Sequence, residues 1–187
     1  LDEIHMYDLY VPVIDIEKEH IEFKDAVNII LEGLNPLGEE YLSIFKNGIK
    51  DGWIDIYQNE GKRGGAYSWG SYDTMPYVLL NYDHSLNDVS TFAHEMGHSI
   101  HSYYSRKNQP YIYAGYTIFC AEVASTTNEV LLINHLINKE TDKNRKLYLI
   151  NQELEQIRAT VFRQLMFAEF ELYTHESIEG GNPLTAE

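Results

Sequence analysis

Apolar residues recur every three to four positions along much of this chain, which is the spacing of one face of an α-helix. The pattern predicts helices over residues 17–33, 37–50, 87–105 and 117–138, and a longer helix that begins near Asn144. In this last helix the apolar stripe predicts a seam facing a core, formed by Leu147, Ile150, Leu154, Ile157, Val161, Leu165, Ala168 and Leu172.

Shorter stretches are rich in β-branched and aromatic residues or alternate in polarity, and these predict strands at 7–15, 53–58, 64–70 and 75–83. Pro12 argues against a central position for the first of them. The run at 77–82 is followed closely by helix-capping residues, so we expect it to be an edge strand beside the helix at 87–105. The expected fold is therefore mainly α with a small antiparallel β-sheet.

A glycine-rich loop, "NEGKRGG" at residues 59–65, joins two of the predicted strands. It lacks the glycine spacing and the Ser or Thr of a phosphate-binding P-loop. The loop is better interpreted as a flexible hairpin or as a loop on the substrate side of a site.

Composition limits the classes of partner. The chain has 187 residues, is 44% hydrophobic and carries a formal net charge of −15, so it can bury a sizeable core but would repel nucleic acid and anionic membrane surfaces. No apolar run approaches the ~18 residues of a membrane span. With Cys120 as the single cysteine, no intrachain disulfide can form, which favours a reducing, cytoplasmic location.

The stretch "TFAHEMGHSIHSYYS" at residues 91–105 carries the clearest chemistry. On a helix, His94 and His98 stand one turn apart on the same face, about 6 Å along the axis, as two ligands of one zinc ion. Glu95 lies about 100° round the helix and can reach a metal-bound water as a general base. Gly97, with no side chain, could admit close packing. The pattern favours a zinc site over a chance match on a polar face.

A catalytic zinc needs a third protein ligand. His101 lies roughly 10 Å along the axis from His94, so a packing or supporting role is favoured over ligation. On the next predicted helix, Glu122 lies among apolar residues, where an unpaired carboxylate is costly. Glu129 is its competitor, and could instead orient a ligand histidine or be solvated. The spacing leaves these alternatives open.

The motifs together resemble those of a known family. "HEMGHSIH" and "YAGYTIFCAEVAST", with the upstream "GAYSWGSYDTMPYVLLNY" and the downstream "ESIEGGNPLTAE", are similar to oligoendopeptidase F, in the thimet oligopeptidase family of zinc metallopeptidases. The resemblance implies one Zn²⁺ per chain held by His94, His98 and Glu122, with Glu95 as catalytic base. It also implies a zincin-like, mostly helical catalytic domain that cleaves internal bonds of short peptides in a deep channel.

Members of this family are longer, with a helical region before this segment and a segment rich in His and Tyr after it. We therefore expect residues 1–187 to be a partial catalytic domain, a fragment of a longer chain. The family aligns substrate by β-addition, which residues 77–82 would provide here. No individual substrate-binding residue is predicted.

Two other classes of protein fit parts of the pattern. One is a non-catalytic, zinc-stabilised helical module that binds peptides or a partner protein, and the other is a metal-free helical protein. The position of Glu95 favours the enzyme, because a structural zinc has four protein ligands and no use for a base. The lack of a complete channel favours the non-catalytic module.

Overall fold

The computed structural model describes residues 3, 5, 7, 8, 11, 14 and 19–185. The strand expected at 7–15 falls largely outside this set, as do residues 17 and 18 of the helix expected at 17–33. Residues 19–22 are described and are not helical, so that helix begins later than predicted, at Phe23. The chain divides into two compact units, one of residues Glu17–Glu140 and the other of Leu1–Ile16 with Thr141–Glu187. Each unit is described by itself below.

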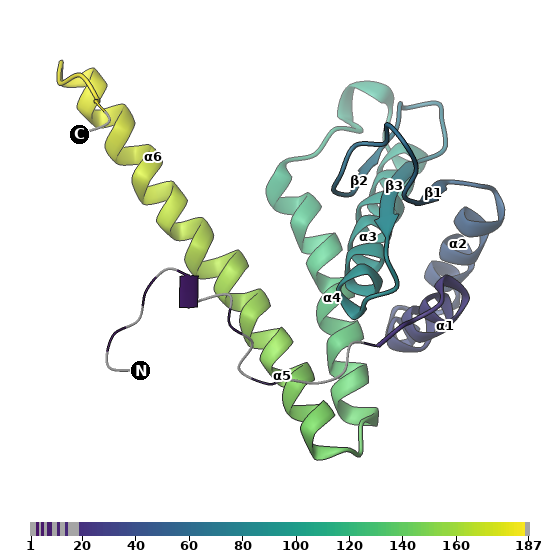
Figure 1. The fold of residues 1–187 in the computed structure, drawn as a ribbon. Coiled ribbons are helices and arrows are strands. Elements are labelled where there is room, and N and C mark those ends of the chain that lie inside the picture. Colours follow the sequence, from purple (N-terminus) through teal and green to yellow (C-terminus); the bar gives the residue numbers. More distant parts are fainter. Residues whose placement is uncertain are drawn as a thin grey trace. The chain divides into compact units, whose positions relative to one another are not determined.

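The first unit is built round a long helix. Its helical elements are α1 (Phe23–Gly33), the short 3-10 helix η2 (Asn35–Leu37), α2 (Glu39–Lys50), α3 (Leu86–Asn108), a second 3-10 turn η3 (Tyr111–Tyr113) and α4 (Ile118–Lys139) (Figure 1). A capping box starts α3, because the Asp88 backbone N–H donates to Ser85 Oγ at 3.1 Å and the Ser85 N–H donates to the Asp88 carboxylate at 3.0 Å. The sequence therefore encodes the beginning of α3 locally.

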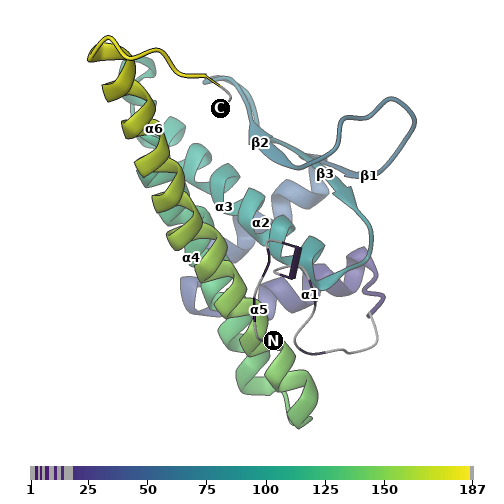
Figure 2. The ribbon, with the colours of Figure 1, turned by 60° about the vertical axis from the view of Figure 1, so that its left-hand side comes forward.

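The apolar face of α3 forms the centre of the core. Phe92, Met96 and Ile100 are fully buried, together with Ile30 of α1 and Phe45 of α2. Figure 2 shows α3 between α4 and the sheet. The opposite face of α3 lies outside this apolar core and bears the partly exposed His94 and His98.

A three-stranded sheet packs against α3. Its strands are β1 (Ile54–Tyr57), β2 (Tyr67–Trp69) and β3 (Tyr77–Tyr82), in the order β1-β3-β2. Because β1 pairs with β3 in parallel and β2 pairs with it antiparallel, the sheet is mixed and only partly antiparallel. The predicted mostly helical fold with a small sheet is confirmed.

The prediction that residues 77–82 form an edge strand is wrong, since β3 has a neighbour on both sides. Val78, Leu80 and Tyr82 are buried, so the most apolar strand takes the central position. The short strands β1 and β2 occupy the edges, as is common in natural sheets. These two strands do not pair with each other, so the loop at 59–65 is not a hairpin turn. Lys62 braces it by donating to the Tyr57 carbonyl at 2.7 Å.

In the second unit, α5 (Lys143–Ile157) continues through a π-helical stretch, η4 (Arg158–Phe162), into α6 (Arg163–Glu179). The residues of the predicted seam are all exposed in this chain, for example Leu154 at 60% and Leu165 at 58%. The interpretation as a core-facing seam is therefore wrong here, because a helical stripe identifies an apolar face but not what covers it. Among the described helices, none has the length and apolar character needed to cross a bilayer.

Candidate metal centre

The structure brings His94 and His98 of α3 and Glu122 of α4 together. The two histidine Nε2 atoms are 3.1 Å apart, and the Glu122 carboxylate lies 3.5 Å from His94 Nε2 and 3.7 Å from His98 Nε2. Zn–ligand bonds of about 2.0–2.1 Å at tetrahedral angles separate the ligand atoms by about 3.3 Å. The two distances from Glu122 involve different oxygens of its carboxylate, so the three side chains lie close enough to share one ion. Two imidazoles with one carboxylate are a donor set of catalytic zinc.

The surroundings of Glu122 differ from those predicted from its apolar neighbours in sequence. Its side chain is 47% exposed and the nearby Phe119 is 76% exposed, so it is not a carboxylate buried in apolar surroundings. Its orientation comes from Ser125, whose buried hydroxyl donates to Glu122 Oε2 at 3.0 Å. The role of Glu122 as a ligand remains a prediction, now supported by its distance from the histidines.

Close contact between α3 and α4 places the three groups. A Cβ atom on Gly97 would lie 2.7 Å from Ser125 Cα and 3.0 Å from the Ala124 carbonyl oxygen, so only glycine allows this approach. Asn128 secures it, because its buried side-chain amide donates to the Ala93 carbonyl of α3 at 2.9 Å. The close packing suggested for Gly97 is therefore found at the site itself.

Glu129 lies beside the donor group rather than in it. One of its carboxylate oxygens is 2.9 Å from His94 Nδ1, and the other accepts from the Ser90 hydroxyl at 3.3 Å. This contact favours the imidazole tautomer that carries its proton on Nδ1, which leaves Nε2 free for a metal. Of the alternatives that the sequence left open for Glu129, the geometry favours the orientation of a ligand histidine.

His101 is not part of the donor group. Its ring stacks on Tyr116 with centroids 3.9 Å apart and planes at 25°, and burial lowers its pKa. Its Nδ1 atom is buried and has no hydrogen-bond partner among the described residues. These contacts agree with the packing role favoured for it over ligation.

Glu95 is buried on α3, with 8% of its surface exposed. Burial raises the pKa of Glu95, and the negative charges of Glu122 and Glu129 raise it further. The charge of His94 and a hydrogen bond from the backbone of Ser68 act in the opposite direction. A raised pKa strengthens a carboxylate as a proton acceptor, which suits a general base.

The two histidines differ in proton affinity in the metal-free protein. Burial by itself would lower the pKa of His94, but the hydrogen bond and charge of Glu129, with the charges of Glu95 and Glu122, raise it overall. Burial and the charge of His94 lower the pKa of His98. Neutral imidazole is the form that binds metal. The lowered pKa of His98 favours this neutral form, whereas protonated His94 would have to lose its proton before it could bind a metal.

A groove of about 520 Å³ opens on His98 and Glu122. It is bordered by β2, α3, the segment before α4 and the first turn of α4, through residues that include Ser68, Trp69, Gly70, Arg106, Tyr116 and Ile118. The sequence predicts no individual substrate-binding residue in this groove. A strand pattern does not show which strand borders the histidine helix, and the 74% exposure of Trp69 is seen only in the structure.

Comparison with known proteins identifies the family. The model of Peptidase family M3 matches residues 1–187. The chain belongs to peptidase family M3. Its sequence is 52% identical over 187 residues to Oligopeptidase PepF of Bacillus subtilis, covering 100% of this chain and 28% of that protein. The resemblance to oligoendopeptidase F is thereby confirmed.

Solved structures agree with this placement in family M3. A crystal structure from Chlamydophila abortus shares 48% identity with a TM-score of 0.83, over 99% of this chain and 31% of that one. Oligoendopeptidase-F from Enterococcus faecium shares 34% identity with a TM-score of 0.58, over 99% of this chain and 25% of that one. The chain thus spans less than a third of each of these three relatives.

Proposed function

We propose that residues 1–187 are the metal-binding part of the catalytic domain of a longer zinc metallopeptidase, which hydrolyses internal bonds of short peptides. The observation that carries this proposal is the convergence of His94, His98 and Glu122 at distances suited to one tetrahedral ion. Membership of peptidase family M3 supports the reaction class, and the greater length of the relatives supports the longer chain. A cytoplasmic location remains a prediction.

The residues of this chain have separate tasks in the proposed reaction. A zinc ion bound by the three ligands would supply a Lewis acid and lower the pKa of water towards ~7. Glu95 would accept the proton of the attacking water and return it to the leaving amine, a task that its raised pKa assists. Glu129 holds the His94 ring in position, and Ser125 holds the Glu122 carboxylate.

The substrate would lie in the groove beside β2. β3 cannot align a peptide by strand addition because both of its edges are paired. β2 is an edge strand among the described strands, and its residues Ser68 and Trp69 border the groove that leads to His98. Backbone groups of an edge strand can hold an extended peptide without reading its side chains, which suits a broad range of short peptides.

The decisive experiment is Glu95→Gln in the full-length gene product, with Glu39→Gln, an exposed residue of α2, as the matched control. The amide keeps the shape of Glu95 but cannot accept the proton, so we expect peptide hydrolysis to fall by about 10²–10⁴-fold. Zinc content, measured by mass spectrometry, should stay at the wild-type level. Glu39→Gln should change neither quantity.

Three results would change the proposal. Equal loss of zinc and activity in Glu95→Gln would make Glu95 a ligand or a structural support. Undiminished hydrolysis would exclude it as the base. A full-length wild-type protein that binds zinc but cleaves no peptide would favour the non-catalytic peptide-binding module.

A further inference from the structure

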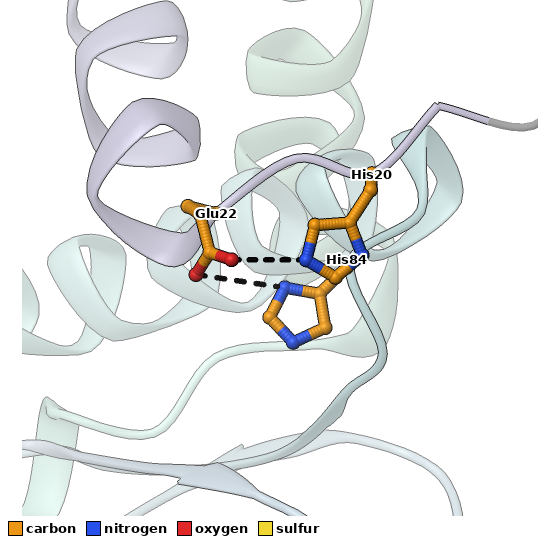
Figure 3. Close-up of side chains that lie close together, drawn as sticks. All are labelled: His20, Glu22 and His84. Atoms are coloured by element: carbon orange, nitrogen blue, oxygen red, sulfur yellow. Dashed lines mark hydrogen bonds and ion pairs between the residues drawn. The ribbon is translucent and has the colours of Figure 1, made fainter.

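A second group of potential metal ligands lies where the segment before α1 meets the connection between β3 and α3. Figure 3 shows His20, Glu22 and His84 directed toward one another. His20 Nε2 is 2.9 Å from one oxygen of Glu22, and His84 Nδ1 is 3.9 Å from the other. One donor atom from each residue lies within 4.8 Å of the other two. None of these residues belongs to the candidate metal centre.

The backbone holds this cluster together. The Ile21 N–H donates to the His84 carbonyl at 2.8 Å, and the Ile21 carbonyl accepts the Tyr82 hydroxyl at 2.9 Å. Each ligand residue is therefore at or next to a residue that cross-links the two segments. The imidazoles of His20 and His84 are stacked, with ring centroids 4.0 Å apart and planes at 20°. The three side chains are thus held close to one another, and rotation of one imidazole out of the stack would direct both rings at a common ion.

His84 adopts a conformation that residues with a side chain rarely take. Its φ is +64°, and it is the only non-glycine residue with a positive φ in the described part of the chain. Such a conformation is unfavourable for a residue with a side chain and persists where the surroundings enforce it. Here it directs the imidazole toward Glu22, with Nδ1 3.3 Å from the Ile21 carbonyl. A metal could take Nδ1 from that carbonyl without leaving it unpaired, since the Tyr82 hydroxyl remains bound.

We propose that His20, Glu22 and His84 form a second binding site for a divalent transition-metal ion, with Zn²⁺ as its first candidate. Two imidazoles and one carboxylate are borderline ligands that suit zinc. One donor atom from each residue lies within 4.8 Å of the other two, so small side-chain rotations would bring all three to the ~3.3 Å between ligands of a tetrahedral ion. His20 and Glu22 side chains are 65% and 60% exposed, so water can complete the coordination.

The site has a structural consequence. Glu22 is the N-cap residue of α1, and His84 precedes Ser85, the N-cap of α3. An ion bound here would clamp the beginnings of these two helices to each other. Because the ion binds the folded arrangement and not the dispersed residues of the unfolded chain, it would raise the melting temperature. Metal binding at this second site does not depend on the proposed peptidase activity.

Zinc titration of the metal-stripped, full-length gene product tests the proposal, with bound metal counted by mass spectrometry. Each of the two ligand sets in the wild type should bind one zinc ion. His84→Asn is the sharpest variant, because Asn tolerates the positive φ but lacks the imidazole. It should lose one equivalent, as should His20→Gln. The double variant His94→Gln/His98→Gln should lose the other. His175→Gln, an exposed histidine of α6, is the control.

Melting temperature provides an independent readout. Adding Zn²⁺ beyond the first equivalent should raise the melting temperature of the wild type and of His175→Gln, but not that of His84→Asn. One equivalent in the wild type with no loss in His84→Asn would overturn the second site. The second site would also be overturned if His175→Gln lost as much zinc as His84→Asn. Loss of zinc confined to the His94/His98 double variant would show that only the candidate metal centre binds.

Discussion

Replacing Gly97 by alanine tests whether the contact between α3 and α4 sets the geometry of the candidate metal centre. The new Cβ would lie 2.7 Å from Ser125 Cα, whereas carbon atoms in ordinary contact are about 3.5–4.0 Å apart. The overlap involves backbone, so no side-chain rotation relieves it. The two helices must separate locally by about 1 Å.

The magnitude follows from three contributions. Overpacking of a core costs about 1–3 kcal/mol, and helix separation would stretch the buried hydrogen bond from Asn128 to the Ala93 carbonyl. Alanine has a higher helix propensity than glycine, which offsets about 1 kcal/mol of this loss in the free energy of unfolding. We expect Gly97→Ala to lower the free energy of unfolding by about 1–2 kcal/mol. Ligand positions tolerate about 0.2 Å, so zinc affinity should fall by about 10–100-fold.

Two assays and one matched control separate damage to the site from general destabilisation. Urea unfolding measures the free energy, and competition with a chromophoric chelator measures zinc affinity. Gly48→Ala on α2 is the control, because its Cβ would meet the Trp53 ring at 2.6 Å, in a part of the core formed by α2 rather than by α4. We expect it to destabilise the fold comparably while zinc affinity stays at the wild-type level.

The outcome for Gly97→Ala can refute the reasoning in two ways. Wild-type stability would show that the helices yield without cost and that the close contact is not required. Destabilisation with unchanged zinc affinity would show that the spacing between α3 and α4 does not control the site.

Three further predictions rest on other contacts. In the metal-free protein, Glu129→Gln should lower the pKa of His94, measured by NMR titration. The pKa of His94 in the folded protein lies above the unfolded value of 6.5, so protonated His94 stabilises the fold below pH 6.5. This contribution is lost as the pH rises through the folded pKa. An unchanged His94 pKa in Glu129→Gln would refute the role of Glu129. Ser85→Ala should cost about 1 kcal/mol in urea unfolding through loss of the α3 cap, and no change would show that Asp88 caps the helix alone. Chelation should abolish peptide hydrolysis by the full-length gene product and added Zn²⁺ should restore it, whereas hydrolysis that persists without metal would contradict zinc catalysis.

Local features of this protein could be predicted from its sequence. The helices at 37–50, 87–105 and 117–138 correspond to α2, α3 and α4 within a few residues, because hydrophobic periodicity and caps act within one helix. The pairing of His94 with His98 follows from the same periodicity, since residues four apart share one helix face. The close packing at Gly97 could also be predicted, because glycine has no side chain to keep a neighbouring helix away.

Only the tertiary structure decided which distant groups meet. A run of β-forming residues does not name its neighbours, so the central position of β3 and the place of β2 beside the groove could not be inferred. Glu122 and Glu129 have similar local sequence signals, and the packing of α4 on α3 alone puts one at Nε2 and the other at Nδ1 of His94. His20 and His84 are far apart in sequence, and their segments meet through the backbone hydrogen bond from Ile21 to His84 and the bond from the Tyr82 hydroxyl to the Ile21 carbonyl. Helix geometry is set by contacts within a few residues, whereas these sites depend on chain packing over long separations.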